Sequence, residues 1–279
     1  LVLSFIPIVF GVLLAIASSS ESLTSNNGSA STLSSELSWG HLSTEFNDLP
    51  LPGGSNQQVV ALVGDIDLDG VNDFVIGARR APGPALVWYR RDAIGWTRYV
   101  AETDTLQLEA GGALFDVDGD GDLDIVAGTN NQANQIWWWE NPHPNHAPNT
   151  NWTRRFIKNA GAKKHHDLMF GNFDDDPEAE LVYWNQGAKA LLIVDIPANP
   201  RNTQPWPNSS VVYNAPDNRR EGLAQADIDG DGKTDIIGGG YWFKHNGGSS
   251  FTAHLVESGV FKRVAVGQLV PGGRPEIVQ

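Results

Sequence analysis

A nine-residue acidic pattern recurs along the chain at nearly constant spacing, and this repeat most restricts what the chain can fold into. "DIDLDGVND" begins at residue 65, "DVDGDGDLD" at 116, "NFDDDPEAE" at 172 and "DIDGDGKTD" at 227, so the intervals are 51, 56 and 55 residues. A degenerate copy, "QLVPGGRPE", begins at 268. A short apolar segment follows every copy. Repeats of this length predict structural units that are stacked or arranged radially.

Each unit has room for four short strands. In the first unit the apolar segments predict strands at 58–64, 73–78, 85–90 and 96–101. Four-stranded units of about 40–50 residues are typical of β-propeller blades, and the Trp and Tyr residues of the third and fourth strands are expected to fill the space between blades. The 30 glycines, 16 prolines and lack of a sustained helical period agree with an all-β fold. A parallel β-helix is the alternative, although its turns are shorter.

The acidic repeats carry the oxygen ligands that Ca²⁺ prefers, in a turn tight enough to direct several of them inward. Positions one, three, five and nine supply carboxylates, and position seven supplies a backbone carbonyl. In the three closest copies these residues are Asp65, Asp67, Asp69, Val71 and Asp73; Asp116, Asp118, Asp120, Asp122 and Asp124; and Asp227, Asp229, Asp231, Lys233 and Asp235. A lysine suits the carbonyl position because only its backbone faces the metal. Without His or Cys, the ligands favour Ca²⁺ over zinc.

The other two copies depart from the pattern. The copy at 172 has Pro177 in place of the turn glycine, and its weaker ligand set is Asn172, Asp174, Asp176 and Glu180. The copy at 268 keeps only Gln268 and Glu276 and is expected to bind no metal. Solvated Asp-rich turns are the alternative, since Asp and Gly favour turns. Three copies in register favour about three calcium sites, with the copy at 172 as a fourth candidate.

The D-x-D-x-D-G-x-x-D loop, with a strand before it and an apolar segment ending in Gly after it, resembles the VCBS / FG-GAP repeats of β-propellers. The resemblance covers residues from about 39 to 279. It implies a propeller, often of seven blades, whereas this sequence holds about five units and stops at "PEIVQ", the second strand of the fifth. Half a blade leaves strand edges unpaired, so we expect a fragment of a longer chain. A partial five-bladed ring is the alternative.

The amino-terminal segment predicts export. Residues 1–17 are apolar and uncharged, as in a signal peptide or a membrane anchor, and residues 18–38 form a Ser-rich linker before the propeller at 39–279. We therefore expect a secreted or cell-surface protein that meets a membrane only through the first segment, if it is uncleaved. The net charge of −14 argues against nucleic acid as a partner. Of the 33 Asp and Glu residues, 18 fall in the four acidic windows, so the charge belongs mainly to the repeat.

A ligand site is expected where the first strands of the blades converge on the channel mouth. Comparable positions five or six residues before each repeat, with their neighbours, hold Gln58, Glu109, His165, His166, Asp167, Arg220, Glu221, Lys262 and Arg263. This mixed-charge ring suits a polar ligand such as a sugar. His165, His166 and Asp167 are candidates for acid–base chemistry. His143 and His146 are predicted to be exposed loop residues.

Three functions remain open from the sequence. The first is a secreted calcium-binding module that recognises carbohydrate or an extracellular protein. The second is a carbohydrate-active lyase or dehydratase: some sugar dehydratases have a propeller of these repeats, and the segment W-x-E-N-P…N-W-T-x-R at 138–155 is similar to theirs. The third is a structural spacer of a surface protein. A propeller fold by itself does not decide between them.

Overall fold

The computed structural model describes residues 13–15, 39–55, 57–207 and 209–279, and over these ranges the chain forms β-strands, turns and loops without any helix. Four antiparallel sheets of four strands each follow one another along the chain, and a two-stranded sheet lies at either end. The described fold is therefore all-β. The antiparallel pairing throughout these sheets excludes the parallel β-helix.

Each four-stranded sheet has its strands in chain order. The strands of the first two sheets are β3 (Gln58–Gly64), β4 (Asp73–Ala78), β5 (Leu86–Arg91) and β6 (Trp96–Glu102), then β7 (Ala113–Phe115), β8 (Asp124–Gly128), β9 (Ile136–Glu140) and β10 (Thr153–Lys158). The strands of the next two are β11 (His165–Gly171), β12 (Glu180–Asn185), β13 (Ala190–Asp195) and β14 (Ser210–Asn214), then β15 (Ala224–Ala226), β16 (Asp235–Gly238), β17 (Tyr241–Gly247) and β18 (Ser250–Leu255).

The two short sheets pair β1 (Leu13–Ala15) with β2 (Trp39–His41) and β19 (Ala265–Gly267) with β20 (Glu276–Val278). In the second pair, β20 lies within "PEIVQ" and is the second strand of the fifth unit, as predicted. Residues 1–12 and 16–38, which hold most of the predicted export segment and linker, lie outside the described residues.

The predicted strands of the first unit agree closely with the structure. β3 and β4 match the predicted ranges, β5 is shifted by one residue at both ends, and β6 is one residue longer. The second strand of each sheet is covered on both faces, which explains its continuous apolar run. All residues of β8, β12 and β16 are buried. The first strands are only partly buried, and β7 and β15 hold no fully buried residue.

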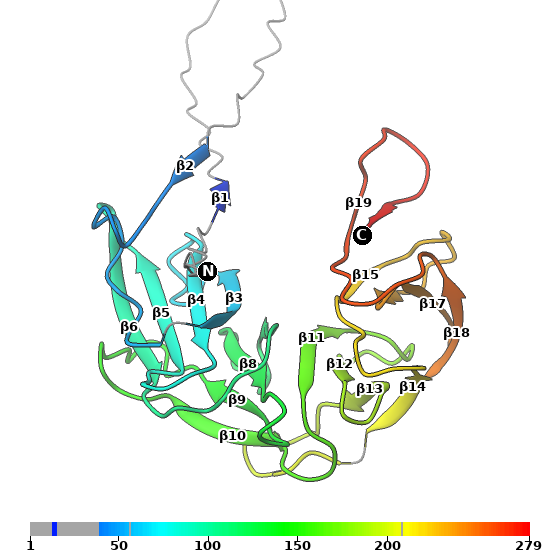
Figure 1. Ribbon diagram of the computed structural model, residues 1–279, viewed down its shortest axis with the longest axis horizontal. Helices are drawn as coiled ribbons and strands as arrows, with labels where there is room; N and C mark the ends of the chain where they lie inside the picture. Colours follow the sequence, from blue (N-terminus) through cyan, green and yellow to red (C-terminus); the bar gives the residue numbers. More distant parts are fainter. Residues whose placement is uncertain (1–12, 16–38, 56, 208) are drawn as a thin grey trace, which may run out of the picture.

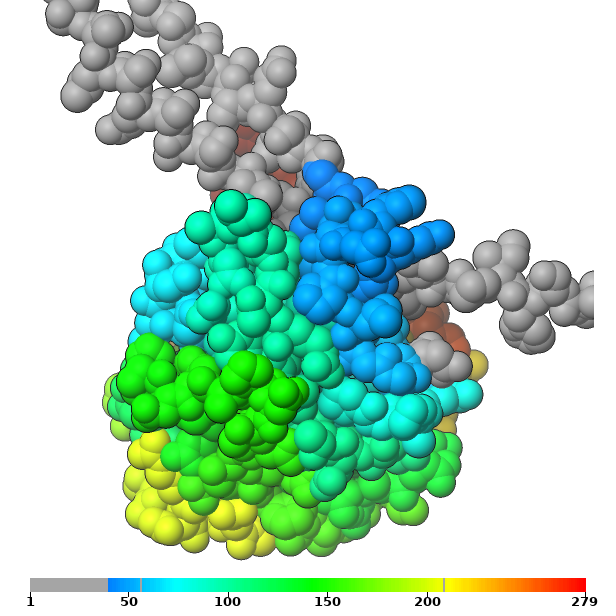
Figure 2. Space-filling model, turned by 90° about the vertical axis from the view of Figure 1, so that its left-hand side faces the viewer, coloured from blue at the N-terminus to red at the C-terminus, as the bar shows by residue number. Residues whose placement is uncertain are grey.

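The sheets lie side by side around an arc, as Figure 1 shows, with β3, β11 and β15 toward its inside and β6, β10, β14 and β18 toward its outside. Contacts between first strands agree with this arrangement, because β3 contacts β7, β7 contacts β11, and β15 contacts β19. Residues 41–55 lie against the first sheet, and Figure 2 shows this blue segment beside the cyan strands. The Tyr89 hydroxyl donates to the Pro50 carbonyl over 2.8 Å there.

The hydrophobic core is divided into layers between neighbouring sheets. Trp88 of β5 and Trp139 of β9 belong to the layer between the first two sheets. Trp138, whose side chain points to the opposite face from Trp139, packs against the third sheet, and Trp184 packs against the fourth. All four indoles are at most 1% exposed. The prediction that aromatic side chains fill the space between neighbouring units is confirmed.

Candidate metal sites and the inner-strand cavity

The four acidic loops each bring three carboxylates together. Within each loop one oxygen from every member lies within 4.8 Å of the others, and the groups are Asp65, Asp67 and Asp69; Asp116, Asp118 and Asp124; Asp174, Asp176 and Glu180; and Asp227, Asp229 and Asp235. The loop at 172 therefore gathers its acidic side chains as the others do, despite Pro177. The ninth position belongs to the group in three loops, whereas Asp73 lies outside the group of the first.

In the three closest copies the turn is closed by the carboxylate at the first position, Asp65, Asp116 or Asp227. The Asp116 carboxylate accepts hydrogen bonds from the Gly119 and Gly121 amides over 2.8 and 2.9 Å. Both glycines have positive φ, 74° and 98°, a conformation that a side chain would strain. Asp227 accepts equivalent bonds from its own loop. The turn that directs the carboxylates inward thus favours glycine at these positions, although Leu68 and Asp175 adopt positive φ, 58° and 73°, at the fourth position of their own loops.

Burial and mutual repulsion destabilise the charged form of the carboxylates in the second loop. Burial, reinforced by the neighbouring carboxylates, raises the pKa of Asp118 to about 6 and that of Asp122 to about 7. Burial raises the pKa of Asp124 to about 8. The Asp118 side chain is only 2% exposed, and its Oδ1 has no hydrogen-bond partner among the described residues. Asp67 and Asp229 each have a similar unpartnered Oδ1. Oxygen-only donors of this kind fit a hard divalent cation.

A basic side chain from another part of the chain lies against each of the three closest copies. The Arg201 guanidinium lies 2.9 Å from Asp118 and 2.7 Å from Asp120. Lys244 pairs with Asp229 and, over 2.6 Å, with Asp231. Arg90 lies 3.9 Å from Asp67. These cations offset part of the loop charge, and the repeat pattern gave no sign of them because they lie outside it.

The position-seven residues differ in where their side chains go. The Lys233 ammonium lies 2.6 Å from Asp175 of the neighbouring sheet's loop, away from the carboxylates of its own loop. Asp122 is instead buried close to its neighbours' charges. Val71 is exposed.

The two divergent loops make internal contacts in place of some ligands. In the loop at 172, the Asn172 amide donates to the Asp176 carbonyl, and burial raises the pKa of Glu180 to about 7. In the loop at 268, Gln268 donates to the Val270 and Gly272 carbonyls. The latter loop contributes no group of clustered acids among the described residues.

The carboxylate at the ninth position also connects its loop to the third strand of its sheet. Asp73 is fully buried; one oxygen accepts from the Arg91 amide over 2.8 Å and the other from the Trp88 indole over 3.0 Å. Asp124 joins the Val117 and Asn141 amides in the same way, and Asp235 joins those of Ile228 and His245. Glu180 and Glu276 keep the bond to the loop amide. The recurrence of an acid at this position therefore has a structural cause besides metal binding.

We expect the substitution Asp73→Ala to lower the free energy of unfolding by about 3 kcal/mol, because it leaves buried amide and indole donors without an acceptor. The loss should be the same with calcium and with chelator, as Asp73 lies outside the carboxylate group. The substitution Asp67→Ala, by contrast, should cost more with calcium than without. Urea titrations of both variants measure this, and a calcium-dependent cost for Asp73→Ala would make Asp73 a ligand.

The raised pKa of Asp122 predicts a pH-dependent effect of removing its charge. A carboxyl whose pKa rises from 3.8 in the unfolded chain to about 7 in the folded one binds its proton more tightly when folded, so its ionisation destabilises the fold as pH rises through this range. In calcium-free buffer, Asp122→Asn should therefore raise Tm near pH 8, and this gain should shrink toward about pH 4. Thermal melts of both proteins across this range test it; a gain that is constant with pH would contradict it.

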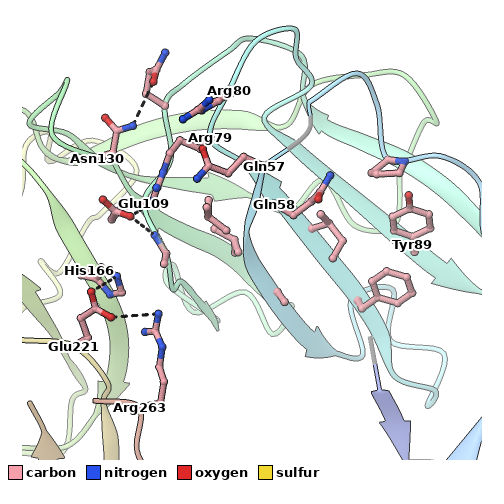
Figure 3. Close-up of a pocket in the computed structure, with 18 of the residues that line it drawn as sticks. Gln57, Gln58, Arg79, Arg80, Tyr89, Glu109, Asn130, His166, Glu221 and Arg263 are labelled. Carbon is pink, nitrogen blue, oxygen red and sulfur yellow. Dashed lines mark hydrogen bonds and ion pairs between the residues drawn. The ribbon is translucent and has the colours of Figure 1, made fainter. Parts of the chain in front are cut away.

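A cavity of about 1390 Å³ lies along the inner strands of the first sheet and reaches the third and fourth sheets. Five of the predicted ligand residues line it, namely Gln58, Glu109, His166, Glu221 and Arg263. Figure 3 shows His166, Glu221 and Arg263 facing Glu109 and Arg79 across it. The starts of the inner strands thus contribute polar side chains to one space, as the repeat spacing predicts.

His166 is the centre of a charged network on one wall of the cavity. Its Nδ1 lies 2.7 Å from Asp167 and its Nε2 3.2 Å from Glu221, and the side chain is 5% exposed. Arg263 contacts both carboxylates, over 3.3 and 3.4 Å. Burial acts to raise the pKa of Asp167, but the hydrogen bond from His166 and nearby positive charges outweigh it, so the pKa is lowered. Asp167 also accepts from the Gly222 amide over 2.7 Å, which ties the third sheet to the fourth.

The other predicted ligand residues lie outside the cavity lining. His165 is fully buried, and burial lowers its pKa to about 3. Arg220 is buried and donates to the carbonyls of Gly239 and Gly259 over 2.8 and 2.7 Å. Lys262 pairs with Glu257. Of the histidine pair at 165–166, therefore, only the second is presented to the cavity, since neighbouring strand residues point to opposite faces.

The expectation that His143 and His146 are exposed is wrong. Both are half-buried, and the His146 ring lies 4.6 Å from the Trp88 ring while its Nε2 lies 2.7 Å from Asn141 Oδ1. Burial lowers the pKa of His146 to about 4. The composition of the Pro/Asn-rich loop did not reveal this packing because the indole comes from the preceding sheet.

Several lining residues were missed from the sequence. They are polar or basic and include Gln57, Arg79, Arg80, Asn130, Asn131, Gln132 and Lys164. Because β3 and β4 are antiparallel, with Gln58 opposite Ala78, the residues after the second strand reach the same end as those before the first. The sequence therefore contained a signal that Arg79 and Arg80 line the cavity, because they directly follow the predicted strand "DFVIGA".

The segment at 138–155 that is similar to part of sugar dehydratases has mainly structural contacts here. The Asn141 amide donates to the Ile66 and Leu123 carbonyls over 2.9 and 3.1 Å, so it bridges the first two acidic loops. Trp152 belongs to the core, and Arg155 pairs with Glu140. None of these residues lines the cavity described above.

The chain is similar to a solved structure but matches no known sequence family. No protein-family model matches the chain, including any for the VCBS / FG-GAP repeats that it resembles, and no curated protein matches it either. Among solved structures it is similar to the V. cholerae biofilm matrix protein Bap1, with a TM-score of 0.44, 15% identity and 79% of this chain covered. The chain spans 34% of the length of that protein. Among the described residues, no helix is long and apolar enough to cross a membrane.

Proposed function

We propose that the chain is a calcium-stabilised extracellular recognition module of the VCBS / FG-GAP type that binds carbohydrate, its four-stranded sheets being blades of a β-propeller. The order of the strands from the inside to the outside of the arc, and the aromatic layers between sheets, support the propeller. The observation that carries the proposed function is the polar cavity, which collects side chains from several sheets at the starts of the inner strands.

The proposal that the chain binds calcium is supported by carboxylate oxygens that have no hydrogen-bond donor among the described residues. Asp67, Asp118 and Asp229 are the central ligands proposed, each with an unpartnered buried oxygen. The acids at the first and fifth positions complete these sites, together with Asp124 and Asp235 and the position-seven carbonyls. A bound Ca²⁺ supplies positive charge and coordination to groups that otherwise repel one another. In a chain without cysteine, such ions stabilise the fold where disulfides are absent.

Recognition is favoured over acid–base catalysis by the surroundings of His166. Both ring nitrogens already face carboxylates, so neither has a free direction toward a molecule in the cavity. The network is suited to hold Glu221 and Arg263 in place beside a ligand. A spacer without a ligand would not need a cavity lined by so many polar groups.

Calcium should raise Tm by about 10 °C. Three sites with a Kd near 0.1 mM, at about 1 mM calcium, contribute roughly 4 kcal/mol, and a domain of this size gains about 2–4 °C per kcal/mol. Thermal melts in calcium and in EGTA measure the effect. Asp118→Asn should remove part of it, and Glu45→Gln, an exposed acid outside the loops, should leave it intact. Equal melting temperatures with and without calcium would refute the calcium part of the proposal.

Glycan binding should depend on Glu221. Its carboxylate is a charged acceptor on the cavity wall, so Glu221→Gln should weaken binding to any glycan identified on an array by about tenfold. The matched control is Glu257→Gln, since Glu257 pairs with Lys262 outside the lining. A silent array, or equal binding by both variants, would remove carbohydrate recognition by this cavity from consideration and favour a spacer.

A further inference from the structure

We propose that the inner-strand cavity selects acidic glycans, with the ligand's carboxylates held by Arg80 and Lys164. This inference rests on the proposed recognition of carbohydrate and narrows its ligand class. It is based on a difference among the charged side chains of the cavity: some have a partner of opposite charge within the chain, and others have none.

Most charged groups of the cavity are committed to one another. Arg79 pairs with Glu109, and its Nε donates to the Leu108 carbonyl over 3.0 Å. Arg263 and His166 both contact Glu221, and both also contact Asp167 beside the lining. These groups therefore form two clusters in which acidic and basic side chains face one another. Neither cluster contains an arginine without a carboxylate partner.

Arg80 and Lys164 remain without such a partner. Both line the cavity, and neither has a carboxylate within 4.0 Å among the described residues. In a chain with a net charge of −14, two unpaired cations facing one cavity give it a local charge opposite to that of the whole. Such a local field attracts anionic groups.

The backbone holds Lys164 at the cavity. Its φ is +68°, and its carbonyl accepts from the Gln186 amide over 2.8 Å. Its neighbour His165 is fully buried, and the His165 amide donates to the Thr129 carbonyl over 2.9 Å. A left-handed residue between two such contacts has little freedom to turn away. The Lys164 backbone is thus fixed at the edge of the cavity.

The rest of the lining suits hydroxyl groups. The amides of Gln57, Gln58, Asn131 and Gln132 belong to it, and Gln57 Oε1 is buried without a hydrogen-bond partner among the described residues. A buried acceptor of this kind gains by receiving a hydroxyl proton. Carboxylates with many hydroxyls are the chemistry of uronic-acid oligosaccharides, and this combination favours them over an acidic peptide.

The test is isothermal titration of the calcium-loaded chain with short oligosaccharides of glucuronate, galacturonate and mannuronate. Each is compared with its carboxyl-reduced counterpart, which keeps the hydroxyls and loses the charge. A poly-glutamate peptide is titrated in parallel. The double variant Arg80→Gln with Lys164→Gln is compared with Lys189→Gln plus Arg274→Gln, which removes the same charge from exposed positions outside the lining.

At least one uronate oligosaccharide should bind at least about tenfold more tightly than its reduced counterpart. The double variant should lose that preference, the control pair should keep it, and added salt should weaken it. The inference is overturned if no uronate binds, if reduced and acidic forms bind equally, if only the peptide binds, or if both variant pairs lose affinity alike. If only reduced glycans bind, the selection of acidic glycans is refuted while the proposed recognition of carbohydrate is supported. Calcium-dependent melting of the same samples tests the metal sites separately.

Discussion

The ninth-position carboxylate is the interaction on which the rest of the fold depends. In three sheets its two oxygens join an amide of the acidic loop to an amide in the last part of the third strand or just beyond it. The turn between the first two strands is thereby tied to the third strand of the same sheet. Asp73, Asp124 and Asp235 are each at most 1% exposed, so these bonds are shielded from water. One short side chain thus sets both the turn and the position of the neighbouring strand.

That bond has an electrostatic consequence for the loop. A carboxylate buried behind the turn adds to the repulsion among the carboxylates in front of it: burial, and to a smaller extent Asp118 and Asp122, raises the pKa of Asp124 to about 8. The chain offsets the charge in part with Arg201 and Lys244, which approach from other segments. A divalent cation in the proposed sites would compensate the charges that the fold itself brings together. The acids are close to one another for a structural reason, and the proposed metal sites make use of that proximity.

The sequence predicted the features that are local. Strand ranges, turn glycines and the grouping of acids follow from alternation and from backbone conformation within about twenty residues, and "DFVIGA" or "DVDGDGDLD" contains all that is needed. It did not predict which member of His165–His166 faces the cavity, because a β-bulge between His166 and Leu168 shifts the register there. It also missed the burial of His146, the approach of Arg201 and the lining position of Lys164. These depend on how one sheet packs against the next, which no repeat pattern encodes.

The acidic loops and the basic residues of the cavity, Arg80 and Lys164, lie at opposite ends of the inner sheet strands. β3 begins at Gln58, which lines the cavity, and ends at Gly64, directly before the first acidic loop. Seven residues of strand span about 23 Å, more than two Debye lengths at physiological salt. Charge at the loops is therefore largely screened from Arg80 and Lys164, which can attract an anion although the chain as a whole is strongly acidic. Calcium at one end would then influence binding at the other through the rigidity of the inner strands, and not through its charge.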